Sequence, residues 1–252
     1  MNFESNGALV ARINGTKKKL HVTDKIEEGD AVHKEIKLPS TQSFQLVPNT
    51  EMERQILYIC GASGSGKSFF AKQYCEEYTK QHKKNAIYLF SSIPEDPSVD
   101  SIKNLKRVQI SDPEFLDEDW SISDFENSLI IFDDCDCISD KQVRTKIQTI
   151  AEMCLETGRH KNISIIFTSH TACNGHQTKK ILNESHSITL FLRSLGGKAL
   201  KYLLESYLGL SKQQIKRVKL MKGDGRALTI TKTYPSVAFS EKRAILLHDE
   251  DD

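Results

Sequence analysis

The chain has 252 residues, of which 38% are hydrophobic and 27% charged, a composition typical of a globular protein with one substantial core. Its 35 lysines and arginines balance 34 aspartates and glutamates, so bulk charge does not indicate a nucleic-acid-binding protein, and any such surface must be local. The six cysteines are irregularly spaced, which argues against a secreted disulfide framework, and the sequence contains neither an apolar run of membrane-spanning length nor an N-terminal signal pattern.

The first 50 residues predict a small β arm or appendage. Residues 8–13 and 20–22 have the composition of short strands. They flank Asn14-Gly15, a dipeptide that favours hairpin turns. We therefore expect a hairpin here, beside the main domain.

The stretch GASGSGKS, residues 61–68, matches the pattern G-x-x-x-x-G-K-[ST] of a phosphate-binding loop. Residues 56–60 are strand-like, and residues 69–80 can form a helix whose N-terminal amides face an anion. Lys67 would reach the β and γ phosphates of ATP, and Ser68 would offer its hydroxyl to Mg²⁺. A flexible glycine- and serine-rich linker is the alternative interpretation. The residues expected to bind the nucleotide are Gly61, Ala62, Ser63, Gly64, Ser65, Gly66, Lys67, Ser68 and Phe69.

Residues 128–132 form an apolar run that stops at Asp133-Asp134, as a Walker B strand would. Asp133 would hold Mg²⁺ through its water shell, and Asp134 would act as the general base or orient water. The alternative is a strand that ends in a solvated, aspartate-rich turn. Two strand-like segments, 85–92 and the weaker 107–110, precede this run. They are compatible with an extra strand between the Walker A and Walker B strands, the arrangement of ATPases that carry a catalytic acid.

A helix is predicted over residues 139–157, with Gly158 as its C-cap, and residues 163–167 form another buried strand. This strand ends in Thr168-Ser169-His170, which would lie beside Walker B. One of these side chains, with His170 among the catalytic candidates, would sense the γ-phosphate or orient water. Alternatively, Thr168 and Ser169 only cap a turn.

A strand over 187–192, a helix over 198–208 and a β-like run over 226–233 follow. Alternating strands and helices predict an α/β fold with a mostly parallel sheet covered on both faces. With the phosphate loop, the Walker B pattern and the extra strand, the expected fold is a three-layer P-loop NTPase of the RecA/ASCE type. The ATPase domain should span residues 51–240, and residues 241–252 should form an acidic tail.

The segments GASGSGKS, IYLFSS, LIIFDD, ETGRHKNISIIFTSH and ILNESHSITLFLRS occur in the order seen in the FtsK/HerA superfamily. Residues 52–195 most resemble the genome-packaging ATPases of poxvirus-type and giant DNA viruses. In the cellular branch a glutamine commonly ends the sensor strand and a glutamate follows the Walker B aspartate. Here His170 and Asp134 occupy these positions, so the presumed base is shorter by one methylene.

The resemblance implies a ring of subunits, expected to be a hexamer, that encircles double-stranded DNA. ATP and Mg²⁺ would bind between neighbouring subunits. Such a ring needs a cation supplied in trans to the γ-phosphate. Arg159, expected near the ligand-binding end of the sheet, is the first candidate, and Arg193 is the second. Viral capsid or internal-membrane proteins are possible partners, and the expected location is the host-cell cytoplasm, at a viral factory, or the virion.

Two basic clusters could contact DNA phosphates or could be solvated faces: residues 17–19, and the run Lys212, Lys216, Arg217, Lys219 and Lys222. Cys135-x-Cys137 and Cys173-x-x-His176 do not form a recognised four-ligand zinc spacing, so no metal other than Mg²⁺ is expected. The preferred function is a translocase that packages viral DNA. The alternatives are a P-loop nucleotide or nucleoside kinase, for which no arginine-rich lid is evident, and a non-motor ATP-dependent assembly switch.

Overall fold

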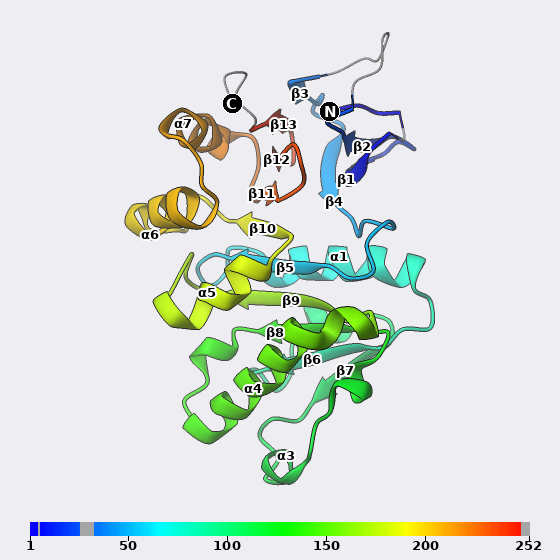
Figure 1. Cartoon of the computed structure of the whole chain (residues 1–252), viewed down its shortest axis with the longest axis vertical. Coiled ribbons are helices and arrows are strands. Elements are labelled where there is room, and N and C mark those ends of the chain that lie inside the picture. The colour runs from blue at the N-terminus through cyan, green and yellow to red at the C-terminus, as the bar shows by residue number, and fades with distance from the viewer. Residues whose placement is uncertain (5, 26–32, 248–252) are drawn as a thin grey trace.

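A ten-stranded sheet forms the centre of the molecule, and the computed structural model describes residues 1–4, 6–25 and 33–247 (Figure 1). Six neighbouring strands are parallel and carry the segments that the sequence predicts to bind a nucleotide. Their order is β10 (Ser187–Leu190), β5 (Ile56–Cys60), β9 (Ser164–Ser169), β8 (Leu129–Asp133), β6 (Ile87–Ser91) and β7 (Leu105–Val108). Strands β5, β8 and β9 are buried at every position because both faces of the sheet are covered, which explains their apolar runs.

The strand order confirms an extra strand between the Walker A strand β5 and the Walker B strand β8. The inserted strand is β9, which pairs in parallel with both neighbours. It follows Asp133 in the chain, whereas the two earlier segments, β6 and β7, lie on the far side of β8. The carboxyl ends of β5, β9 and β8 therefore meet at one edge of the sheet.

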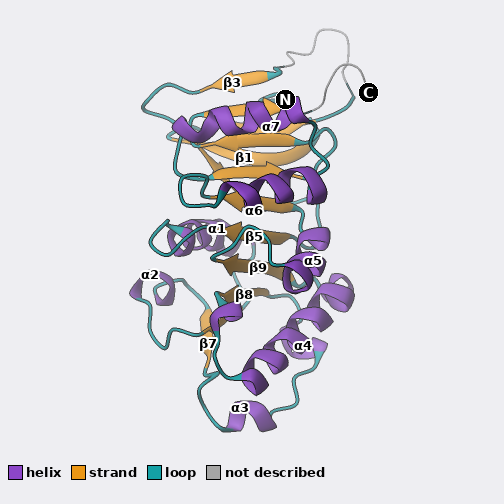
Figure 2. Ribbon diagram, turned by 90° about the vertical axis from the view of Figure 1, so that its left-hand side faces the viewer, coloured by secondary structure: helices purple, strands orange, loops and turns teal. Residues whose placement is uncertain are grey.

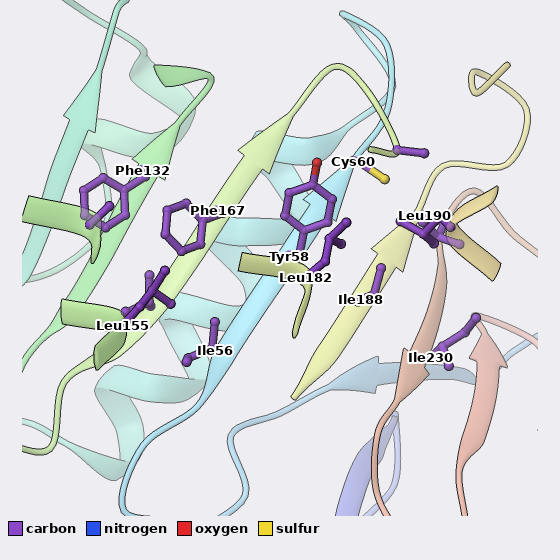
Figure 3. Packing of buried hydrophobic residues seen from close by; sticks show 14 of the residues in the cluster. Ile56, Tyr58, Cys60, Phe132, Leu155, Phe167, Leu182, Ile188, Leu190 and Ile230 are labelled. Atoms are coloured by element: carbon purple, nitrogen blue, oxygen red, sulfur yellow. The ribbon is translucent and has the colours of Figure 1, made fainter. Parts of the chain in front are cut away.

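Helices cover both faces of the parallel strands, so the predicted three-layer α/β architecture is confirmed (Figures 1 and 2). Helix α1 (Lys67–Gln81) packs on one face, and α4 (Lys141–Thr157) and α5 (Gly175–Glu184) pack on the other. Figure 3 shows the second face, where the rings of Phe132, Phe167 and Tyr58 lie side by side under these helices. Shorter helical segments are α2 (Pro97–Asp100), α3 (Glu114–Asp117) and the 3₁₀ turns Ile122–Phe125, Cys135–Cys137, Gly158–Lys161 and Met221–Gly223.

Four antiparallel strands extend the sheet beyond β10, and we call them the antiparallel extension. The sequence indicated only the first of these strands. In spatial order they are β11 (Leu228–Thr231), β12 (Val237–Ser240), β13 (Arg243–Leu246) and β3 (Glu35–Lys37). The segment 241–252, expected to be a tail, therefore begins inside a hairpin, because Ala244 and Ile245 are fully buried between β12 and β3. Residues 248–252 lie outside the described residues.

The N-terminal residues form the expected β appendage, a three-stranded sheet of β2 (Lys19–Val22), β1 (Ala8–Asn14) and β4 (Ser43–Leu46). The hairpin predicted at Asn14-Gly15 joins β1 to β2. This small sheet packs on the antiparallel extension, where the rings of Phe44 and Phe239 lie 6.2 Å apart. Strand β3 comes from the same region but completes the large sheet.

Two helical segments cover the opposite face of the extension (Figure 2). The helix predicted over 198–208 is α6 (Gly197–Tyr202), continued by a π-helical turn at Leu203–Tyr207. Helix α7 (Lys212–Leu220) was not predicted, and it packs through Ile215 and Val218.

Replacing Phe132 by alanine should lower the free energy of unfolding by about 3–5 kcal/mol. Its side chain is 1% exposed, and its ring stacks on Phe90 and Phe167 with centroids 5.2 and 4.9 Å away. Urea denaturation would measure the effect. The control Leu220→Ala, at a side chain that is 64% exposed, should change stability by less than about 0.5 kcal/mol. Equal losses in the two variants would contradict this packing.

Candidate nucleotide site

The loop between β5 and α1 lies at the carboxyl edge of the parallel strands. Gly66 has a φ of 112°, in the left-handed region that glycine favours, and it directly precedes α1. A Cβ atom on Gly61 would lie 2.6 Å from Ser65 Oγ and 2.8 Å from Phe191 Cβ, so no side chain fits there. The loop is thus tightly turned, and the unpaired amides at the N-terminus of α1 open onto it.

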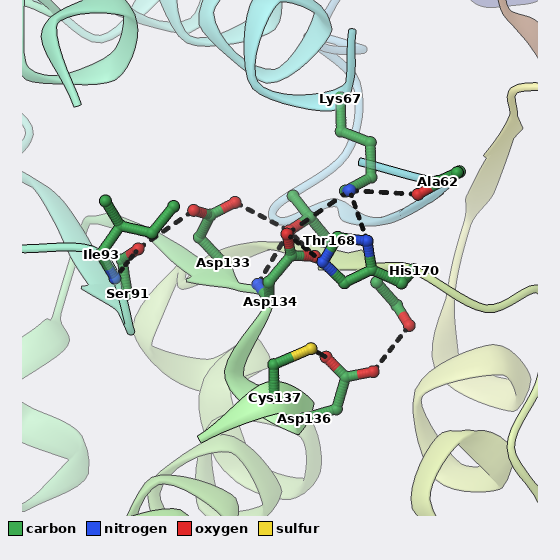
Figure 4. A network of polar contacts seen from close by, with 12 residues as sticks. Ala62, Lys67, Ser91, Ile93, Asp133, Asp134, Asp136, Cys137, Thr168 and His170 are labelled. Atoms are coloured by element: carbon green, nitrogen blue, oxygen red, sulfur yellow. Dashed lines mark hydrogen bonds and ion pairs between the residues drawn. The ribbon is translucent and has the colours of Figure 1, made fainter. Parts of the chain in front are cut away.

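Lys67 is 6% exposed, and its ammonium group is held inside the site (Figure 4). Its Nζ lies 3.1 Å from the Gly61 carbonyl oxygen, 3.4 Å from Asp134 Oδ2 and 3.4 Å from His170 Nδ1. The structure therefore brings three predicted catalytic residues, Lys67, Asp134 and His170, into direct contact.

The other predicted loop residues differ in exposure. Ser63, Gly64 and Phe69 are exposed, with Phe69 at 61%, whereas Ser68 is half-buried in the first turn of α1. The Ala62 amide donates to Ser194 Oγ at 3.1 Å, which joins the loop to the segment after β10. The main-chain amide of Ser65 donates to the Ala62 carbonyl and closes a turn.

Asp133 ends β8 as a buried carboxylate with a hydroxyl group on each side. Ser91 Oγ donates to its Oδ2 at 3.1 Å, and Thr168 Oγ1 donates to its Oδ1 at 2.8 Å. Burial raises the pKa of the Asp133 carboxyl, and the charge of Asp134 raises it further, while the Thr168 and Ser91 hydroxyls act in the opposite direction. The site therefore holds a carboxyl group whose charged form is disfavoured by burial and partly restored by two hydroxyl donors.

Thr168 links the two carboxylate residues. Its hydroxyl accepts the Asp134 amide at 2.9 Å, and its one proton serves either Asp133 Oδ1 or Asp134 Oδ1, which lies 3.2 Å away. Asp134 has a φ of 47°, so this contact fixes a backbone turn that a non-glycine residue rarely adopts.

Thr168 and Ser169, which end β9, and His170, which follows it, have separate contacts that the sequence could not distinguish. Thr168 touches both carboxylates, as described above. His170 Nε2 lies 3.0 Å from Asp134 Oδ2. Ser169 Oγ donates instead to Asp136 Oδ2 at 3.0 Å. Successive residues of a strand point to opposite faces, so Ser169 leaves the site that Thr168 lines.

Asp133 and Ser68, which the sequence predicts to hold Mg²⁺, both carry oxygen atoms of the kind that this cation prefers. In the described part of the chain, no group of three or more His, Cys, Asp or Glu side chains is placed to hold a metal by itself. Cys135, one of the two cysteines of the Cys135-x-Cys137 pattern, donates through its Sγ to the Phe90 carbonyl at 3.4 Å.

Arg159 does not lie near the ligand-binding end of the sheet, and that expectation of position is wrong. A helix that follows a parallel strand runs back to the start of the next strand, so the residues after α4 lie at the amino edge. There Arg159 Nε contacts Glu53 Oε2 at 2.9 Å, just before β5. Arg193, by contrast, follows β10 at the carboxyl edge, where its Nε donates to the Lys222 carbonyl at 3.4 Å.

Arg226 is a site residue that the sequence did not indicate. Its Nη2 donates to the Ser65 carbonyl of the phosphate loop at 3.1 Å. Glu241 Oε1 accepts the amides of Arg226 and Ala227 at 3.0 and 3.2 Å, and this holds the segment in place. The sequence around Arg226 has no phosphate-binding motif. The contact exists because the antiparallel extension brings this distant residue to the phosphate loop.

Asp133→Asn should make the ligand-free protein more stable than the wild type at pH 7. Because the folded-state pKa of Asp133 is raised, its contribution to stability is fully present below the unfolded pKa of about 3.9 and is lost as pH rises through the folded pKa. A neutral asparagine escapes this loss, so the difference should shrink as pH falls from 7 to 4. Urea denaturation across this range, with exposed Asp119→Asn as the control, measures it. An Asp133→Asn protein that is less stable at pH 7 would contradict the expectation.

The resemblance to the FtsK/HerA superfamily implied a P-loop NTPase fold, and the order of β5, β9 and β8 with the loop before α1 confirms that fold. No family model matches the chain. It is similar in structure to B204, the DNA-packaging ATPase of Sulfolobus turreted icosahedral virus, with 18% identity, a TM-score of 0.47 and coverage of 71% of this chain and 94% of that chain.

It is also similar to the genome packaging NTPase B204 of Sulfolobus turreted icosahedral virus 2 in complex with AMPPCP (14% identity, TM-score 0.48, 71% and 93% covered). A further similar structure is the conjugation coupling protein TcpA of pCW3 (11% identity, TM-score 0.47, 97% and 78% covered). In sequence, the chain is 39% identical over 250 residues to the uncharacterized protein V3 of Sputnik virophage, with 97% of each chain covered. The chain therefore belongs to the family of the Sputnik virophage protein V3.

Proposed function

We propose that the chain is an ATP-driven translocase that packages double-stranded viral DNA into capsids. The observation that carries the proposal is the contact of Lys67, Asp134 and His170 above the buried Asp133, at the edge where β5, β9 and β8 end. The proposed site combines a phosphate loop, a carboxylate for the metal and a second acid at the carboxyl edge of the sheet. This combination suits the attack of water on a γ-phosphate. The FtsK/HerA resemblance supplies the coupling to DNA, and membership in a virophage family supports a viral role.

In this proposal, ATP binding transfers the Lys67 ammonium group from Asp134 to the β and γ phosphates. The freed Asp134 carboxylate would then accept a proton from the attacking water. His170, hydrogen-bonded to Asp134, would keep that carboxylate oriented. Ser68, and Asp133 through the water shell of the ion, would hold Mg²⁺, which would neutralise charge on the phosphate oxygens.

The active unit in this proposal is a ring, hexameric by the FtsK/HerA resemblance, in which Arg159 of one subunit completes the site of its neighbour. The distance of Arg159 from its own phosphate loop fits a residue that acts in trans. Its ion pair with Glu53 joins side chains that are 71% and 60% exposed. Such an exposed pair contributes little, so the guanidinium is readily released. Capsid or internal-membrane proteins would anchor the ring, at a viral factory in the host cytoplasm or on the virion. Among the described residues, no helix is both long and apolar enough to span a bilayer.

The first test is ATP hydrolysis with and without duplex DNA. Wild-type protein should hydrolyse ATP faster with DNA, and Lys67→Ala should abolish hydrolysis in a folded protein. Asp134→Asn should bind Mg·ATP and turn it over slowly. The matched control Lys72→Ala, on the same helix but bonded to Ser101, should behave as wild type. Phosphate transfer to a nucleoside would instead identify a kinase, and nucleotide-dependent assembly without DNA stimulation would identify a switch.

Arg159→Ala should retain ATP binding and lose turnover by about 10³-fold or more, as loss of an arginine finger does. Mixing it with Lys67→Ala should restore part of the activity, because a Lys67→Ala subunit still offers its Arg159 to a neighbour with an intact loop. Arg193→Ala, assayed alone and in the same mixture, tests the second candidate. If the subunits exchange and no activity returns, or if Arg159→Ala alone is fully active, Arg159 is not the finger.

A further inference from the structure

Charge in this chain is strongly segregated. Residues 193–222 contain eight lysines and arginines and one glutamate, a net charge of +7 in a chain whose total is +1. We call this segment, which includes α6 and α7, the basic surface. Residues 95–126 contain ten aspartates and glutamates and three basic residues, a net charge of −7. Helix α7 of the first segment and helix α3 of the second lie toward opposite ends of the long axis of the molecule (Figure 1).

Five lysines of the basic surface are exposed to solvent. Helices α6 and α7 bury their apolar residues against the antiparallel extension, and Lys198, Lys212, Lys216, Lys219 and Lys222 are exposed. The three lysines within α7 have helical spacing and lie on one face. They extend over ~10 Å along the helix axis, about three base-pair steps of DNA.

These ammonium groups are available to an external anion. Within residues 1–4, 6–25 and 33–247, the ion pair found on the basic surface joins Lys201 to Glu205 at 3.9 Å, and no carboxylate lies within ion-pair distance of the five exposed lysines named above. The acidic end differs, since Arg107 pairs with Asp100, and Asp96 and Asp124 cap helical segments. Unpaired lysines act as point charges that suit phosphate without reading bases.

We infer that the basic surface binds the phosphate backbone of duplex DNA and transmits that binding to the phosphate loop. This inference rests on the proposed translocase function and names the part of the chain that meets the DNA.

A short covalent and hydrogen-bonded path joins the surface to the nucleotide site. Arg193 Nε donates to the Lys222 carbonyl, which ties together the two ends of the basic surface. The next residue, Ser194, accepts the Ala62 amide of the phosphate loop through its Oγ. Phe191 lies against Gly61 and packs edge-on with Phe70 of α1 at 6.5 Å. A displacement of the basic surface by DNA would therefore act directly on the loop.

The test replaces Lys212, Lys216 and Lys219 together with glutamine, which keeps helix propensity nearly unchanged. The matched control replaces Lys17, Lys18 and Lys19, the other exposed basic cluster, with glutamine. Binding of a fluorescent duplex of mixed sequence is measured over a salt series. The α7 variant should bind at least about tenfold more weakly near 0.1 M salt, with a salt slope lower by about 2–3, because each lost phosphate contact removes about 0.9. Its basal ATPase activity should stay unchanged while DNA stimulation falls, and the control should resemble wild type in both.

The outcomes separate this inference from the proposed function. Absence of DNA stimulation in the wild type would overturn the translocase proposal itself. A stimulated wild type together with an α7 variant that binds and responds normally would overturn only the assignment of the basic surface. Sedimentation of the same proteins tests whether a second copy occupies the surface through the acidic end. An α7 variant that loses self-association but keeps DNA binding would also overturn the inference.

Discussion

The site depends on the register of one strand. Strand β9 pairs with β5 and β8 at once, with Cys60 opposite Ser169 and Phe132 opposite Phe167. This register places the end of β9 between the phosphate loop and the Walker B carboxylates. A slip of one residue would turn Thr168 to the other face of the sheet and leave the Asp134 amide without its acceptor. The backbone pairing of the core therefore also fixes the position of Thr168 relative to the Asp133 and Asp134 carboxylates.

Burial of the Asp133 carboxyl group carries an electrostatic cost in the folded protein. Asp133 is buried beside Asp134, and Lys67 Nζ contacts Asp134, His170 and the Gly61 carbonyl. The raised pKa of Asp133 reflects this cost, because burial disfavours the charged form of its carboxyl group.

The antiparallel extension gives the P-loop core its connections to the rest of the chain. On one face it carries the N-terminal β appendage, and on the other it carries the basic surface. The Phe44 amide of the appendage donates to the Glu241 carbonyl, and the Glu241 side chain holds the Arg226 segment that contacts Ser65 of the loop. On the basic surface, Ser194 contacts the loop directly through the Ala62 amide. A force applied to either face thus has a path to the nucleotide site, whereas the acidic end of the sheet has no such contact with the loop among the described residues.

The sequence by itself determined those features that a short stretch of chain must encode. Residues 61–68 specify a phosphate loop because the tight turn needs glycine, and the apolar run before Asp133 specifies a buried strand that ends in a carboxylate. The Asn14-Gly15 hairpin is local in the same sense. Tertiary structure decided which distant residues join them: Thr168 beside both carboxylates, Arg226 at the loop, and Arg159 at the opposite edge. The strands after β11 escaped prediction for the same reason, since pairs such as Ile36 with Ala244 are specified by packing between segments far apart in the chain.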